Sequence, residues 1–194
     1  MFENLEKYNI VLASNSPRRK ELLQRLGLDF KVRTLLGLDE SYPASLKGEE
    51  IARFISNKKA EAYIPTMDKH EMLITADTIV CTPDGKVLGK PQDEQSAKNM
   101  LETLSGITHD VITGVSIVTA DRKENFSVTS HVTFAKLSEK EINYYIKNYL
   151  PFDKAGAYGI QEWIGLVAVE KIEGSFFNVM GLPVQRLYDK LKTF

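Results

Sequence analysis

Tyr8-Asn9-Ile10-Val11-Leu12-Ala13 is an apolar run, and Ser14-Asn15-Ser16-Pro17-Arg18-Arg19 follows it directly. The run predicts a buried strand. Ser16 is a good N-cap, and Pro17 suits the first helical position because no amide hydrogen is needed there. The helix that follows is expected to end at Gly27, which favours the left-handed conformation found after helix ends. This stretch therefore predicts a strand, a short hydroxyl-rich turn and a helix.

The turn between this strand and this helix has the composition of an anion site. Backbone amides and the helix dipole favour a phosphate group at a helix N-terminus. Arg18 and Arg19 can bind the phosphate in a bidentate fashion. The hydroxyl groups of the turn come from Ser14 and Ser16. We interpret residues 14–19 as a polyphosphate-binding loop.

Size and charge place the chain among ordinary soluble globular proteins. Its 194 residues fit one domain, or one domain with two lobes, and 43% of them are hydrophobic and 26% charged. The net charge is −1, from 25 basic and 26 acidic residues. Clustered positive charge is expected in a general nucleic-acid coat or a membrane-surface protein. We therefore expect no nucleic-acid polymer and no membrane as a partner, although a local basic pocket remains compatible with this balance.

Cysteine content and hydropathy indicate the compartment. Cys81 is the only cysteine in the sequence, so no intramolecular disulfide can form, and a reducing environment is the simple interpretation. The first residues lack the apolar region of a signal peptide. No segment has the apolar length needed to span a bilayer. We expect a cytoplasmic protein.

The remaining pattern predicts an α/β chain without repeats or linkers. Further helices are predicted over residues 48–63, 93–104, 138–149 and 184–191. Further strands are predicted over residues 30–33, 72–81, 110–119, 125–134 and 166–172. Strands and helices alternate early, and β-hairpin character appears in the middle. We predict a mixed, largely extended sheet flanked by helices, in a single domain over residues 1–194 with two lobes and a central cleft.

Asp77 interrupts the apolar strand predicted over residues 72–81. An acid is costly to bury without a partner. The hydroxyls of Thr75 and Thr78 could satisfy the carboxylate, and on the residues alone this structural interpretation and a functional one are about equally favoured. Beside a polyphosphate site, the carboxylate would hold a divalent cation, orient a water molecule, or do both.

Two lysines and an acidic pair are further candidates. Gly89-Lys90-Pro91 holds a lysine in a defined position, where a phosphate oxygen is an obvious target and an exposed turn lysine is the usual alternative. Lys59 lies late in the second predicted helix, where a solvated helix face is the alternative. Asp39 and Glu40 could add carboxylates to a metal shell, although adjacent acids in a loop are usually only solvated.

A glycine-rich stretch, Lys154-Ala155-Gly156-Ala157-Tyr158-Gly159-Ile160-Gln161, has the features of a binding loop. Its glycines allow the backbone to approach a ligand closely. Tyr158 offers a flat stacking face, and Gln161 can both donate and accept hydrogen bonds at a base edge. A tight glycine-rich turn would look similar.

Several common catalytic patterns are absent from the sequence. It contains neither a Gly-x-x-x-x-Gly-Lys-Ser/Thr loop nor a Gly-x-Ser-x-Gly elbow. His70, His109 and His131 are too far apart to form a local metal motif, and we expect each to be a surface or structural histidine. Cys81 is expected to pack as a small hydrophobe in its strand.

Taken together and in order, the motifs resemble the Maf proteins, a family of nucleoside triphosphate pyrophosphatases also described as septum-formation inhibitors. The resemblance runs from about Ile10 to Leu187. It is carried by Leu12–Arg19, Ala76-Asp77-Thr78, Gly89-Lys90-Pro91, Leu104-Ser105-Gly106, Val111–Gly114, Lys154–Gln161 and Gly174–Pro183. One departure is that Glu162-Trp163 follows Gln161, where a glycine is common, which is expected to alter the rim of the base pocket.

The resemblance implies a fold of the Maf and inosine triphosphatase type and a reaction that divides a nucleoside triphosphate between its α- and β-phosphates. It implies a divalent cation, Mg²⁺ or Mn²⁺, and it suggests a homodimer. Asp77 matches the acid regarded as the proton acceptor for the attacking water. The positions that match the polar lining of the phosphate site are Ser14, Arg19, Lys59 and Lys90.

The same resemblance assigns the remaining candidates. Arg18, Thr78 and Gln161 match positions associated with substrate choice. Nucleotide contacts are expected from Ser16, Lys154 and Tyr158, and metal contacts from Asp77 and Glu40.

The combination looks like the subgroup that acts on dTTP and UTP. The 7-methyl-GTP subgroup typically has a glutamate where Gln161 stands. Two alternatives stay open on the sequence: a 7-methyl-GTP-type pyrophosphatase, and a non-catalytic nucleotide-binding regulator of cell division.

Overall fold

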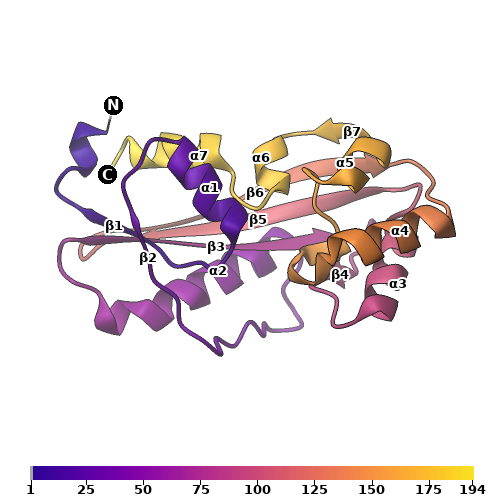
Figure 1. Cartoon of the computed structure of the whole chain (residues 1–194). Coiled ribbons are helices and arrows are strands. Elements are labelled where there is room, and N and C mark those ends of the chain that lie inside the picture. The colour runs from indigo at the N-terminus through magenta and orange to yellow at the C-terminus, as the bar shows by residue number, and fades with distance from the viewer. Residues whose placement is uncertain (1) are drawn as a thin grey trace. The chain divides into compact units, whose positions relative to one another are not determined.

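The computed structural model describes residues 2–194 (Figure 1). Its strands are β1 (Asn9–Leu12), β2 (Lys31–Val32), β3 (Glu71–Cys81), β4 (Val87–Leu88), β5 (Thr108–Val118), β6 (Lys123–Phe134) and β7 (Val169–Glu173). Its α-helices are α1 (Pro17–Arg25), α2 (Glu49–Tyr63), α3 (Glu94–Leu104), α4 (Glu139–Tyr149), α5 (Trp163–Val167), α6 (Phe176–Val179) and α7 (Val184–Leu191). Short 3₁₀ helices are η1 (Glu3–Leu5), η2 (Ile64–Thr66), η3 (Pro151–Asp153) and η4 (Ala155–Ala157).

The strands form a mixed sheet. Over residues 2–194 it has seven strands in the order β2-β1-β3-β5-β6-β7, with β4 paired to β3. Strand β1 lies parallel to β2 and to β3, whereas β4 is antiparallel to β3 and β7 is antiparallel to β6. Parallel neighbours need a crossover, and α1 provides it between β1 and β2. The predicted mixed α/β sheet with flanking helices is confirmed.

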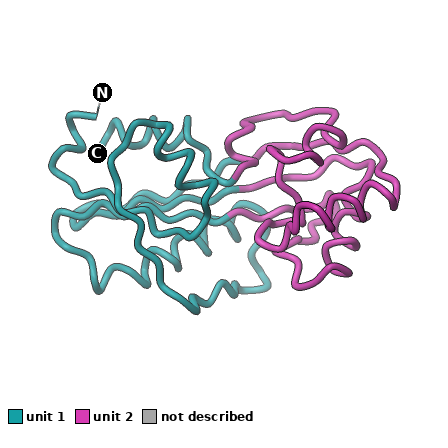
Figure 2. The backbone as a smooth tube through the Cα atoms, in the orientation of Figure 1, with its two compact units in different colours: residues 1–77, 113–128, 181–194 teal, residues 78–112, 129–180 magenta. Residues whose placement is uncertain are grey.

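The chain divides into two compact units, coloured separately in Figure 2. Unit 1 comprises residues 1–77, 113–128 and 181–194, and unit 2 comprises residues 78–112 and 129–180. Strands β3, β5 and β6 each contribute residues to both units. The single domain with a central cleft stays a prediction. No helix within residues 2–194 has the length and apolarity needed to cross a membrane.

The start of unit 1 follows the local signals of the sequence. The Ser16 side chain accepts a hydrogen bond from the Arg19 amide at 3.4 Å, and Pro17 occupies the first turn of α1. Gly27 has a φ of 79°, in the left-handed region that follows a helix end. The N-cap, the helix start and the helix end predicted around α1 are therefore confirmed.

Unit 1 is built around the contact between α2 and the strands. Within this unit, α1 and α7 lie over one face of the strands and α2 lies over the other (Figure 1). The buried residues that pack α2 onto the strands are Val11, Ala13, Ala60, Tyr63, Leu73 and Val118. At Gly114 of β5 an added Cβ would lie 2.1 Å from the Ala52 carbonyl oxygen, so this position has room for glycine alone. The close approach fixes where α2 sits on the strands.

Unit 2 has an aromatic core and one element that differs from the prediction. The strand expected over residues 166–172 starts later, because residues 163–167 form α5 and β7 begins at Val169. The Gly165 amide donates to the Glu162 carbonyl at 2.9 Å, and a Cβ at Gly165 would lie 1.8 Å from the Ile160 carbonyl oxygen. This tight turn forms the start of α5. The apolar residues that suggested a strand are therefore helical here, and Leu166 is 83% exposed.

Candidate active site

Arg19 is anchored by carbonyl groups of unit 1. Its Nε donates to the Gly181 carbonyl and its Nη1 to the Ala76 carbonyl, each at 2.8 Å. Desolvation lowers the pKa of Arg19 from its ordinary value, and the Asp77 carboxylate opposes this shift. Arg19 is therefore held in a fixed position next to the acid that the sequence singled out.

The hydroxyl-rich turn before α1 holds the other predicted residues of this segment. The Ser16 amide donates to Ser14 Oγ at 3.2 Å, so the turn is closed by its own side chain. Ser14, Ser16 and Arg18 are all half-buried at the start of α1. The backbone amides of a helix start and the side chains of the turn thus occupy one short segment, as an anion site requires.

Asp77 is paired with Lys59. Lys59 Nζ lies 2.6 Å from Asp77 Oδ1 and 2.8 Å from Glu40 Oε1. The Lys59 side chain is 13% exposed and that of Asp77 11%, whereas that of Glu40 is 46% exposed. We call these three residues the acid–lysine cluster. One ammonium group therefore brings together both carboxylates that the resemblance assigns to a metal.

The structural alternative for Lys59 is wrong, and Asp77 has a charged partner besides the hydroxyl groups that the sequence offered. The Thr75 hydroxyl donates to the Ser56 carbonyl at 2.7 Å, so it serves the backbone of α2. Asp77 instead receives a charged hydrogen bond from Lys59, which comes from α2. Lys59 therefore does not lie on a solvated helix face. The helix turns it inward because Ala60 and Tyr63 anchor the neighbouring positions in the core.

The carboxylates of Glu40 and Asp77 could hold a divalent cation together with phosphate oxygens. Within residues 2–194, no group of three or more His, Cys, Asp or Glu residues could hold a metal ion. Mg²⁺ commonly uses only one or two carboxylates and completes its shell with water and substrate phosphates. The neighbouring Asp39 is engaged elsewhere, since Lys58 Nζ lies 2.7 Å from its Oδ2 and this hydrogen bond holds the pKa of Asp39 well below its ordinary value.

In unit 2 the segment of Lys90 is tied to the glycine-rich loop. The Gly156 amide donates to the Gly89 carbonyl at 3.0 Å, directly before Lys90. Lys90 and Gln161 are both exposed, and Thr78 follows Asp77 in β3. We call residues 154–162 the Gln161 loop. Its backbone is thus fixed at one end to the segment that carries the predicted phosphate-binding lysine.

Tyr158 lies in the core of unit 2. It is 6% exposed, and its ring packs edge-on against Phe134 with the ring centroids 4.8 Å apart. Its hydroxyl is hydrogen-bonded to His109 Nε2 at 2.8 Å. The structure therefore gives Tyr158 no open stacking face, contrary to the sequence-based expectation. The buried ring of Tyr158 anchors the Gln161 loop. This role follows from the burial of the side chain and could not be predicted from the presence of a tyrosine.

His109 is the buried partner of this tyrosine, and it is 1% exposed. Burial lowers the pKa of His109 to about 4, while the nearby Asp110 carboxylate opposes the shift. His109 is thus a structural histidine, and His70 and His131 are exposed, as predicted. Cys81 is a buried free cysteine and packs as expected.

His109 makes unit 2 sensitive to acid. The unfolded chain protonates this histidine near its ordinary pKa, whereas the folded chain keeps it neutral down to about pH 4. Stability from His109 is therefore complete above about pH 6.5 and is lost as the pH falls toward 4. We expect the free energy of unfolding to fall between pH 7 and pH 4.5 by roughly 2–3 kcal/mol more in the wild type than in His109→Gln. Urea titrations at the two pH values measure this difference, and equal pH dependence in both proteins would contradict it.

Lys154 is neutralised inside the Gln161 loop. It is 7% exposed, and its Nζ lies 2.7 Å from Asp153 Oδ1 and 3.1 Å from Glu162 Oε1. Two carboxylates therefore already neutralise the charge of Lys154, and the nucleotide contact expected from the sequence would have to compete with them. No local sequence pattern indicates that residues 154 and 162 meet, so the partner of Glu162 becomes visible only in the structure.

The chain is similar to known proteins over nearly its whole length. A family model described as Maf-like protein matches residues 9–194. A dTTP/UTP pyrophosphatase of Phocaeicola vulgatus is 60% identical over 192 residues, which is 99% of each chain. Proteins with the same name in Parabacteroides distasonis and Flavobacterium johnsoniae are 60% and 47% identical over 194 and 191 residues, covering 100% and 98% of this chain and 100% and 97% of theirs.

Among solved structures, the Staphylococcus aureus Ham1 protein is 18% identical, with a TM-score of 0.42, over 66% of this chain and 72% of its own. The sequence matches carry the assignment, since they extend over almost the whole chain at high identity. They confirm the resemblance drawn from the ordered motifs. This chain belongs to the family of Maf-like proteins.

Proposed function

We propose that this chain hydrolyses dTTP and UTP to the nucleoside monophosphate and pyrophosphate. The observation that carries the proposal is the acid–lysine cluster, in which Asp77 lies 2.6 Å from Lys59 beside the anchored Arg19. Relatives that are 47–60% identical over nearly the whole chain are named dTTP/UTP pyrophosphatases, which supports the same substrates here.

Asp77 is the proposed general base. A carboxylate held by Lys59 keeps a fixed orientation, so that its other oxygen can accept a proton from an attacking water. Arg19, Lys59 and Lys90 are proposed to neutralise the triphosphate, with Ser14 and Ser16 adding hydrogen bonds at the start of α1. Positive groups that stabilise the charge developing on the leaving pyrophosphate lower the barrier to hydrolysis.

A divalent cation, Mg²⁺ or Mn²⁺, is part of the proposal. The donor set fits it, because Glu40 and Asp77 supply two carboxylates that meet at one ammonium group and the substrate supplies phosphate oxygens. When bound, the cation supplies charge neutralisation at the phosphate oxygens. The protein residues then hold the triphosphate and accept the proton.

Substrate choice is proposed to rest on Arg18, Thr78 and Gln161. Gln161 is exposed on a loop whose neighbouring residue Ile160 is 5% exposed, so its amide is presented outward from a fixed backbone. An amide can donate and accept at once, which matches the donor and acceptor pattern of a thymine or uracil edge. The proposal also includes a cytoplasmic location, from the single cysteine, and a homodimer, from the family resemblance.

Pyrophosphate release from a panel of nucleoside triphosphates tests this function. We expect dTTP and UTP to be hydrolysed in preference to other nucleotides, with Mg²⁺ or Mn²⁺, and activity to be lost in EDTA. A preference for 7-methyl-GTP would retain the reaction and contradict the role of Gln161. Release from no nucleotide by folded protein would favour the non-catalytic regulator of cell division.

A further inference from the structure

The carboxylate of Glu162 is held on both sides within unit 2. Its Oε1 lies 3.1 Å from Lys154 Nζ, and its Oε2 accepts a hydrogen bond from the Tyr145 hydroxyl. The side chains of Glu162 and Lys154 are 20% and 8% exposed, and Tyr145 is fully buried. A mostly buried ion pair with a satisfied hydrogen bond is costly to break, because one partner would remain as a buried charge. Glu162 is therefore a built element of this loop and not a solvated surface acid.

Tyr145 connects this carboxylate to the backbone of the Gln161 loop. The Gly159 amide donates to the Tyr145 hydroxyl at 2.9 Å, while the hydroxyl donates its own hydrogen to Glu162. Burial and the neighbouring Glu162 carboxylate raise the pKa of Tyr145 above its ordinary value, so the hydroxyl keeps its proton. One hydroxyl of α4 thus holds both the glycine and the acid that flank the dipeptide Ile160-Gln161.

The backbone of the turn leaves Gln161 as the exposed residue. The Glu162 amide donates to the Gly159 carbonyl at 2.9 Å, which closes a turn with Ile160 and Gln161 at its centre. Ile160 is 5% exposed and points its apolar side chain into the unit, whereas Gln161 is exposed. A fixed turn of this kind limits the positions that the Gln161 amide can take.

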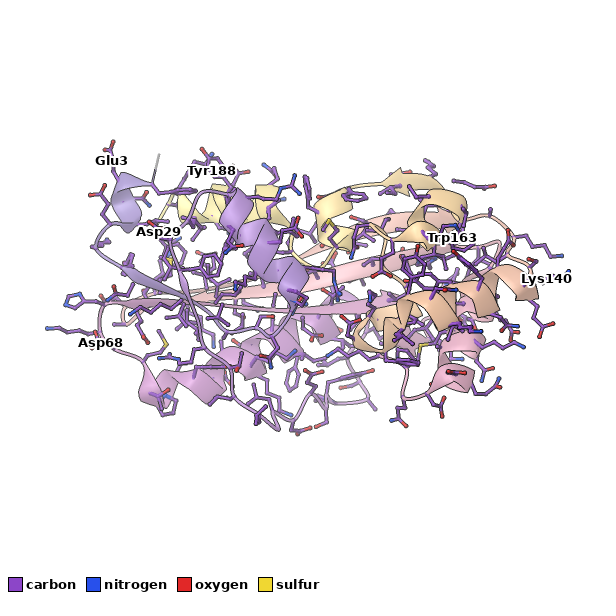
Figure 3. All side chains as sticks on the ribbon, in the orientation of Figure 1. Glu3, Asp29, Asp68, Lys140, Trp163 and Tyr188 are labelled. Atoms are coloured by element: carbon purple, nitrogen blue, oxygen red, sulfur yellow. The ribbon has the colours of Figure 1, made fainter. Side chains whose placement is uncertain are left out.

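Two further contacts secure the same segment. A Cβ at Gly159 would lie 2.8 Å from Glu162 Cδ and 3.0 Å from Lys154 Cε, so the ion pair occupies the space that a side chain would need. Trp163, labelled in Figure 3, packs edge-on against Tyr144 of α4 with the ring centroids 4.8 Å apart. Adjacent residues of α4 therefore hold the adjacent residues 162 and 163.

We propose that Glu162 is a positioning residue for substrate choice: clamped between Lys154 and Tyr145, it fixes the turn that presents Gln161 to the pyrimidine base. The inference rests on the proposed function, since it concerns the base that the same site selects. We call the contacts of Glu162 with Lys154 and Tyr145 the clamp. In this proposal Lys154 is the cation that holds the Glu162 carboxylate. The expected effect of losing the clamp is weaker and less selective nucleotide binding, while the proton transfer at Asp77 is retained.

Two variants break the clamp in different ways. Glu162→Gln keeps the size of the side chain and removes one of the two carboxylate charges that face Lys154, while Asp153 keeps the other. Tyr145→Phe removes the hydroxyl and leaves the ion pair intact. The matched control is Glu173→Gln, because Glu173 Oε2 also pairs with a lysine in this unit, Lys171 at 2.9 Å, but both side chains are about two-thirds exposed (66% and 68%).

The measurement is kcat and KM for dTTP, UTP and GTP, together with thermal unfolding of each variant. We expect both clamp variants to raise KM for dTTP and UTP about 10-fold, with kcat and the GTP constants changed less than about 2-fold. The pyrimidine preference then falls about 10-fold, and Glu173→Gln matches the wild type. Tyr145→Phe decides the outcome if Glu162→Gln does not fold.

A double-mutant cycle with Gln161→Ala separates positioning from general support of the fold. If Glu162 acts through Gln161, neither clamp variant lowers the pyrimidine preference further in the Gln161→Ala background. Multiplicative effects, a loss confined to kcat, or an unchanged preference in both clamp variants would overturn the inference.

A second readout separates this inference from the proposed function. Binding of the non-hydrolysable analogue α,β-methylene-dTTP needs no catalysis, and we expect its Kd to rise about 10-fold in both clamp variants. A wild-type protein that binds the analogue but hydrolyses no nucleotide would contradict the proposed function alone. Equal Kd values in wild type and clamp variants would overturn the role of Glu162, whatever the activity.

Discussion

Asp77→Asn is expected to abolish hydrolysis of dTTP and UTP, with kcat at least about 10³-fold lower. The amide of asparagine is close in size to the carboxylate but accepts no proton from water. The substitution also removes one of the two carboxylate charges that Lys59 Nζ contacts, and leaves Glu40 as the other. Steady-state pyrophosphate release measures the loss, and binding of α,β-methylene-dTTP shows that the nucleotide is still held.

The matched control for this variant is Asp189→Asn. Asp189 also pairs with a lysine, Lys192 at 2.8 Å, but its side chain is 40% exposed on α7. We expect this control to hydrolyse both nucleotides at the wild-type rate. Hydrolysis at the native rate by Asp77→Asn would show that the proton goes elsewhere and would remove the acid–lysine cluster from the chemistry.

Gly114→Ala is expected to destabilise the protein by at least about 3 kcal/mol, or to prevent folding. The new Cβ would lie 2.1 Å from the Ala52 carbonyl oxygen and 2.7 Å from the Arg53 amide nitrogen. These are backbone atoms of α2, which cannot yield as a flexible side chain does. Helix α2 would have to move off β5, and it carries Lys59 with it.

Urea unfolding of Gly114→Ala against Gly89→Ala provides the comparison. A Cβ at Gly89 meets no atom within 4 Å, so this second substitution is expected to change the free energy of unfolding by less than about 1 kcal/mol. A Gly114→Ala protein as stable as the wild type would contradict the close approach of α2 and β5.

Features that depend on neighbouring residues could be predicted from the sequence. The Ser16 cap, the proline in the first turn of α1 and the left-handed Gly27 all follow from backbone chemistry within a few residues. The same holds for the capping box between Ser138 and Glu141 at the start of α4. Such signals need no knowledge of the tertiary structure.

Features that depend on distant residues were harder to predict. Lys59 and Asp77 are 18 residues apart and meet because α2 packs on β3, which no local pattern reveals. Tyr158 looks like a stacking face in the sequence, yet its partners His109 and Phe134 come from β5 and β6 and bury it. The clamp on Glu162 depends likewise on Tyr145 of α4. In each of these three cases the residue type indicated which interactions the side chain can make, and its burial against distant residues determined which of them it does make.

The bond that the wild-type protein cleaves can be identified from the phosphorus NMR spectrum of the products formed from dTTP. We expect thymidine monophosphate and pyrophosphate in equal amounts with Mg²⁺ or Mn²⁺, and neither product in EDTA. Thymidine diphosphate with inorganic phosphate would place the cleavage at the terminal phosphate and contradict the proposed function.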